Sequence, residues 1–95
     1  MNKMEHLLIC LAEEAAEMQQ AACKALRFGL DDGHPDGQTT NAEDIMKEYT
    51  DLIAIMTMLF EAGIIKDFNM DRAIELKREK VLGYMDYARE RGTLE

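Results

Sequence analysis

Apolar side chains recur at helical spacing in three stretches of this chain, roughly residues 3–28, 42–62 and 70–90. Within the first stretch they form one stripe, made by Leu7, Leu11, Met18, Ala21 and Ala25. No stretch of useful length alternates apolar and polar residues, as a half-buried strand would. The pattern therefore predicts an all-α fold with three main helices.

Capping residues indicate where these helices begin and end. Side chains that favour helix starts precede the three stretches, at Asn2, Thr40 and Asn69, and a glycine follows each stretch, at Gly29, Gly63 and Gly92. The segment between the first two helices, residues 29–41, is longer than the usual helix–helix connection of about 2–8 residues. We expect this segment to be either a binding loop or a solvated connector.

The second predicted helix is apolar on two sides. One stripe is made by Ile45, Leu52, Ile55 and Leu59. About 100–160° around the helix lies another, made by Met46, Tyr49, Ile53 and Phe60. A chain of 95 residues forms one domain, residues 1–95, and three helices can hardly cover both stripes. We therefore expect the helical bundle to be completed by homo-oligomerisation.

Two pairs of acidic residues interrupt the apolar stripes. Glu14 lies in the stripe of the first helix and Glu48 in the first stripe of the second, with Glu17 and Asp51 three residues further on. Burying a carboxylate is costly unless something pairs with it. If the two helices pack antiparallel, the four side chains converge, and either their pKa values rise or a cation binds between them.

The types of residue in this group indicate which cation would bind. Carboxylate oxygens without histidine or cysteine favour a hard ion, first Mg²⁺ and then Mn²⁺. Either pair alone would be more typical of a solvated helix face. Because two helices carry the same feature within apolar stripes, we expect a metal site at Glu14, Glu17, Glu48 and Asp51.

Three lysines could accompany this metal site. Lys77 lies in the apolar stripe of the third helix, Lys80 lies at its edge, and Lys24 is near the Glu17 side of the first helix. A metal ion together with lysines is typical of a phosphate-binding site. The alternative for Lys77 is an interface lysine whose aliphatic stem is buried.

Charge and cysteine content restrict the partners of the chain. The formal net charge of −8 argues against binding a nucleic acid polymer, which needs a basic face. The chain has no apolar run of about 20 residues, so we expect no membrane segment. Cys10 and Cys23 form no disulfide framework or metal-binding spacing, which fits a reducing cytoplasmic location.

The acidic residues also form a recognisable two-part motif. Glu13-Glu14-x-x-Glu17 followed by Glu48-x-x-Asp51 resembles the signature of the MazG-like all-α nucleotide pyrophosphohydrolases. That superfamily includes dimeric dUTPases and phosphoribosyl-ATP pyrophosphohydrolases. The similarity covers nearly the whole chain and includes residues 25–29 and Lys77 with Lys80.

The resemblance implies an activity and a site. It implies hydrolysis of an NTP or dNTP between the α and β phosphates, giving the monophosphate and pyrophosphate, as in nucleotide-pool house-cleaning. Glu14, Glu17, Glu48 and Asp51 would hold Mg²⁺, and Glu17 is the preferred general base. It further implies a homodimer or homotetramer, in which Lys77 and Lys80 act on a neighbouring chain's site.

Two other functions remain open at this level. The same stripes would serve a helical interaction protein without catalytic activity. The same chemistry could also act on phosphoribosyl-ATP, although no residue can be tied to that substrate. Phe28, Tyr84 and Tyr87 could stack on a base, or they could be core residues of the bundle.

Overall fold

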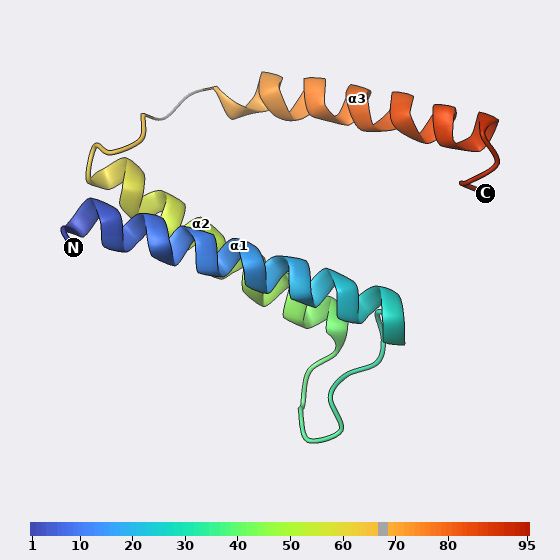
Figure 1. Cartoon of the computed structure of the whole chain (residues 1–95), viewed down its shortest axis with the longest axis horizontal. Helices are drawn as coiled ribbons and strands as arrows, with labels where there is room; N and C mark the ends of the chain where they lie inside the picture. Colours follow the sequence, from blue (N-terminus) through green and yellow to red (C-terminus); the bar gives the residue numbers. More distant parts are fainter. Residues whose placement is uncertain (67–68) are drawn as a thin grey trace.

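A computed structural model describes residues 1–66 and 69–95 of the chain. It contains three helices, α1 (Lys3–Phe28), α2 (Asn41–Glu61) and α3 (Met70–Glu90) (Figure 1). The described part of the chain has no strand. The prediction of an all-α fold with three main helices is therefore confirmed, with α2 displaced by one residue at each end.

The predicted caps form at the starts of α1 and α2. The Asn2 side chain accepts a hydrogen bond from the Glu5 amide at 2.8 Å, and the Glu5 carboxylate accepts one from the Asn2 amide at 3.3 Å. Thr40 and Glu43 form the equivalent reciprocal pair. These bonds satisfy backbone donors that the first turn of a helix leaves unpaired.

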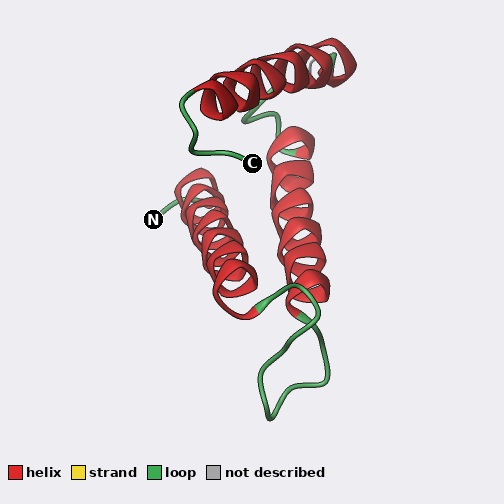
Figure 2. Ribbon diagram, turned by 90° about the vertical axis from the view of Figure 1, so that its right-hand side faces the viewer, coloured by secondary structure: helices red, strands yellow, loops and turns green. Residues whose placement is uncertain are grey.

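The two capped helices pack side by side and antiparallel as a hairpin (Figures 1 and 2). Four apolar side chains are buried between them: Leu7, Ala21, Ala25 and Leu59. All four belong to the two stripes in which the acidic pairs lie. The packing therefore turns these stripes inward, and the acidic residues turn with them.

The 29–41 segment is tied to the start of α2 by a short set of hydrogen bonds. The Asn41 amide donates to the Asp32 carbonyl at 2.6 Å, and its side-chain Nδ2 donates to the Gly29 carbonyl at 2.8 Å. A Cβ atom on Gly33 would collide with the backbone carbonyl oxygen of Thr39, so only glycine allows this close approach. The base of the segment is thus a defined structure.

Helix α3 lies apart from the hairpin (Figures 1 and 2). Within residues 1–66 and 69–95, α1 and α2 are the only helices in contact with each other. Apolar side chains of α3 are consequently exposed, among them Met70, Ile74, Val81, Leu82 and Tyr84. None of the described helices is long and apolar enough to cross a membrane.

Candidate metal centre

The four predicted carboxylates converge in the middle of the hairpin. Glu14 and Glu17 come from α1, and Glu48 and Asp51 come from the antiparallel α2. One oxygen from each lies within 4.8 Å of the others. The three-residue spacing places each pair on one helix face, and antiparallel packing brings the two faces together. Glu13 is not part of the group.

The burial of these side chains is uneven. One oxygen of Glu14 and one of Glu48, in each case Oε2, are shielded from solvent and have no hydrogen-bond partner among the described residues. Asp51 is half-buried, whereas Glu17 is exposed. The sequence predicts that both acidic pairs lie within the apolar stripes that pack between α1 and α2. Glu14 and Glu48 meet this expectation, whereas Glu17 lies at the exposed rim of the packed region. This leaves two buried acceptors that a cation could satisfy.

The geometry is close to what one small cation needs. Oxygens on opposite sides of an octahedral Mg²⁺ ion are about 4.2 Å apart, since each lies about 2.1 Å from the metal. The observed span of up to 4.8 Å exceeds this by an amount that small side-chain rotations can remove. An all-oxygen donor set with two unsatisfied buried atoms fits a hard divalent ion.

Without a cation, the cluster disfavours full ionisation. A hydrogen bond with the Glu17 carboxyl group raises the pKa of Glu48 above its ordinary value, and burial raises this pKa further. The neighbouring Lys47 opposes both effects because its positive charge favours the ionised carboxylate. The two carboxyl groups from different helices are thus close enough to influence each other's proton.

Sequence reasoning missed Lys47. Its Nζ atom lies 2.9 Å from Oδ2 of Asp51 and 3.6 Å from Oε1 of Glu48. The hydrogen bond to Asp51 is the main cause of a raised pKa for Lys47. The four-residue spacing of Lys47 and Asp51 is a signal that could have identified it. One ammonium group against four carboxylates still leaves the cluster negative.

The structure separates the three predicted phosphate-binding lysines. Lys24 lines a cavity at the C-terminal end of α1, beside the 29–41 segment. Lys77 and Lys80 are exposed on α3, which does not contact the hairpin. Within one chain, neither residue is brought to the carboxylate cluster.

Comparison with known proteins gives no match. No family model matches the sequence, and neither a curated protein nor a solved structure is similar to it.

Proposed function

We propose that this chain is a Mg²⁺-dependent nucleoside triphosphate pyrophosphohydrolase. One observation carries the proposal: four carboxylates lie within 4.8 Å of one another, and two of their buried oxygens have no hydrogen-bond partner in residues 1–66 and 69–95. The resemblance of Glu13-Glu14-x-x-Glu17 and Glu48-x-x-Asp51 to the MazG-like signature supplies the reaction. The products are a nucleoside monophosphate and pyrophosphate, consistent with nucleotide-pool house-cleaning.

In this proposal Glu14, Glu17, Glu48 and Asp51 hold the ion, Mg²⁺ first and Mn²⁺ second. An Mg²⁺ ion held by these four residues would supply charge neutralisation for the phosphates and would lower the pKa of a water bound to it. Glu17 is the proposed general base, because its exposed carboxylate at the rim is accessible to solvent water. Glu17 takes one proton from the attacking water. The oxygen of this water bonds to the α phosphorus as the bond between that phosphorus and the α–β bridging oxygen breaks. The bridging oxygen leaves with pyrophosphate.

Lysines would contact the phosphates of the substrate. Lys24 lies two helical turns beyond Glu17 on the same face of α1, within the same chain. Lys77 and Lys80 would come from α3 of another protomer, since their own α3 lies apart from the carboxylates. Point charges on flexible stems suit phosphate groups in several positions.

The surface area of the chain supports a homodimer or homotetramer. A folded monomer of this mass exposes about 5,500 Å², whereas this chain exposes 7818 Å². Its radius of gyration is 16.9 Å, compared with about 12 Å for a compact domain of this length. The excess area is larger than the roughly 800 Å² that each partner buries in a standard interface. Exposed apolar residues of α3 and of the second stripe of α2 are where a second copy would pack.

The activity is tested by incubating the purified protein with each common NTP and dNTP and Mg²⁺, and assaying pyrophosphate. We expect turnover by the wild type, and loss of at least about 100-fold in kcat for Glu48→Gln, which removes a charged ligand at nearly constant shape. Glu13→Gln is the matched control, because Glu13 lies next to Glu14 on α1 but outside the cluster. Full activity of Glu48→Gln would exclude the assigned metal site.

The main rival is a helical interaction protein, which the exposed apolar side chains of α3 would also suit. Thermal unfolding with and without millimolar Mg²⁺ separates the two. A metal-binding enzyme is stabilised by a ligand that binds only the folded state, whereas an interaction protein without a metal site is not. Phosphoribosyl-ATP belongs in the same substrate panel as the nucleotides.

A further inference from the structure

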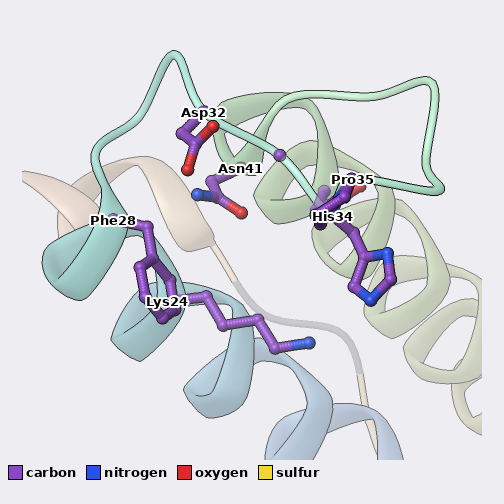
Figure 3. Close-up of a pocket in the computed structure, with 8 residues that line it drawn as sticks. Lys24, Phe28, Asp32, His34, Pro35 and Asn41 are labelled. Carbon is purple, nitrogen blue, oxygen red and sulfur yellow. The ribbon is translucent and has the colours of Figure 1, made fainter.

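A cavity lies at the end of the hairpin where the 29–41 segment connects α1 to α2 (Figure 3). Its volume is about 460 Å³. Its lining includes Lys24, Phe28, Asp32, Asn41 and Asp44. Figure 3 shows Lys24 and Phe28 on α1 on one side of the cavity and Asn41 and Asp32 on the other. The volume falls in the range of pockets that hold small organic ligands, about 300–1,000 Å³.

The α1 side of the cavity is continuous with the carboxylate cluster. Lys24 follows Glu17 by seven residues and Phe28 follows it by eleven, so all three lie within about 20° of one line along α1. Lys24 is about 10 Å along the helix axis from Glu17.

The α2 side of the cavity is likewise continuous with the carboxylate cluster. Asp44 precedes Glu48 by four residues and Asn41 precedes it by seven, so they point to the same side of α2. The distance from Glu48 to Asn41 is again about 10 Å along the axis. A nucleotide whose phosphates reach the carboxylates would therefore place its nucleoside in the cavity.

Phe28 supplies a surface for stacking. Its side chain lines the cavity and is about half exposed. The Arg27 guanidinium lies 4.8 Å from the centroid of the Phe28 ring, which restricts how the ring can turn. An exposed aromatic ring held in this way offers a face on which any base can stack.

The polar lining is rich in hydrogen-bond acceptors. Asn41 is 5 % exposed, and one of its two Nδ2 hydrogens is donated to the Gly29 carbonyl. Its Oδ1 accepts no hydrogen bond from the described residues and remains as an acceptor for a ligand. Asp32 and Asp44 add carboxylate oxygens, which accept hydrogen bonds. Oδ1 of Asp44 accepts from the Thr39 hydroxyl at 2.6 Å, so its second oxygen remains for a ligand. Such a lining suits a base that presents donors.

We propose that this cavity is the nucleoside subsite, and that it selects bases with an amino group over uracil and thymine. Adenine, cytosine and guanine each carry amino hydrogens that the acceptors can receive, whereas uracil and thymine carry carbonyl oxygens at the corresponding positions. The link to the phosphates rests on the proposed pyrophosphohydrolase function. Binding of the base itself depends only on the cavity.

The first test compares Phe28→Ala with Leu26→Ala, whose side chain is 89 % exposed on another side of α1. For a nucleotide that the wild type hydrolyses, Phe28→Ala should raise KM about ten-fold or more, as expected for the loss of base stacking. Leu26→Ala should leave KM unchanged. An unchanged KM in Phe28→Ala, with the enzyme active, overturns the subsite and leaves the proposed function intact.

The second test needs no turnover. AMP, CMP and UMP are titrated without metal into the Glu48→Gln variant, with chemical shifts of the backbone amides followed by NMR. We expect saturable shifts at Gly33 and Asn41 with AMP and CMP, lost on adding Phe28→Ala. CMP should bind at least about five-fold more tightly than UMP, which differs from it in the 4-amino group. Equal affinity for CMP and UMP overturns the base preference, and shifts confined to other residues overturn the subsite. If no NTP is hydrolysed but CMP binds here, the proposed function fails and the nucleoside site stands.

Discussion

The Nζ atom of Lys47 lies 2.9 Å from Oδ2 of Asp51, one helical turn along α2. The same Nζ is 3.6 Å from Oε1 of Glu48, so one ammonium group contacts two of the four clustered carboxylates. Lys47 therefore occupies part of the space and neutralises part of the charge that a metal ion would take. The ammonium group and a divalent cation are expected to compete for Asp51.

Removing this ammonium group should strengthen metal binding. We expect Lys47→Gln to lower the apparent Kd for Mg²⁺ by about two- to five-fold, the scale of an exposed ion pair. The metal-free variant should melt at a lower temperature than the wild type, because repulsion among the carboxylates is less compensated. Calorimetric titration and thermal unfolding measure the two effects. Lys3→Gln is the control, because it removes the same charge at the start of α1. If the Kd for Mg²⁺ and the melting temperature changed equally in both variants, Lys47 would have no specific role.

Protonation of Glu48 should link stability to pH. The pKa of Glu48 is raised in the folded chain, mainly by its hydrogen bond with Glu17, so the folded state holds this proton more tightly than the unfolded state. The resulting stabilisation is fully present below the ordinary pKa of 4.5 and is lost as pH rises through the raised value. In metal-free buffer, the melting temperature of Glu48→Gln should therefore fall less than that of the wild type between pH 4.5 and 7. Glu13→Gln should behave as the wild type does, and identical pH profiles for all three proteins would refute the linkage.

Leu59 should be the most sensitive apolar position of the hairpin. Its side chain is completely buried, at 0 % exposure, whereas Leu26 is 89 % exposed. Leu59→Ala leaves a cavity and should lower the free energy of unfolding by about 2–5 kcal/mol. Leu26→Ala removes the same atoms from an exposed position and should change it by less than about 0.5 kcal/mol. Urea denaturation followed by circular dichroism compares the two, and equal losses would contradict the packing of α1 against α2.

A charge in the second stripe of α2 should disrupt the proposed oligomer. Ile53 is 41 % exposed in the single chain and lies in the stripe that we expect a second copy to cover. Ile53→Glu would bury a carboxylate in that interface and should shift the protein toward monomer. Light scattering after size-exclusion chromatography gives the mass. Gln19→Glu is the control, because it adds the same charge at an exposed polar position of α1 and should leave the mass unchanged. A wild type that is itself monomeric would refute oligomerisation.

Local patterns in the sequence determined the helices of this protein. Residues Asn2 and Thr40 begin α1 and α2 because their side chains accept hydrogen bonds from unpaired amides of the first turn. Helical periodicity also predicted that Glu14 and Glu48 face inward, and both are half-buried with an unpartnered oxygen. These features depend on residues a few positions apart, which is why they can be recognised without the fold.

Only the tertiary structure decided how the helices combine. Antiparallel packing of α1 on α2 brings carboxylates more than thirty positions apart in the chain within 4.8 Å and leaves Glu17 at the exposed rim. It also leaves a cavity between the C-terminal end of α1, the 29–41 segment and the first turn of α2. Periodicity gives the face on which a residue lies but not the depth to which a neighbouring helix covers that face, and this depth sets the burial of the residue. The sequence thus predicts that Glu14 shares a helix face with Glu17, and Glu48 with Asp51. That the two pairs meet in one site depends on the packing of the two helices.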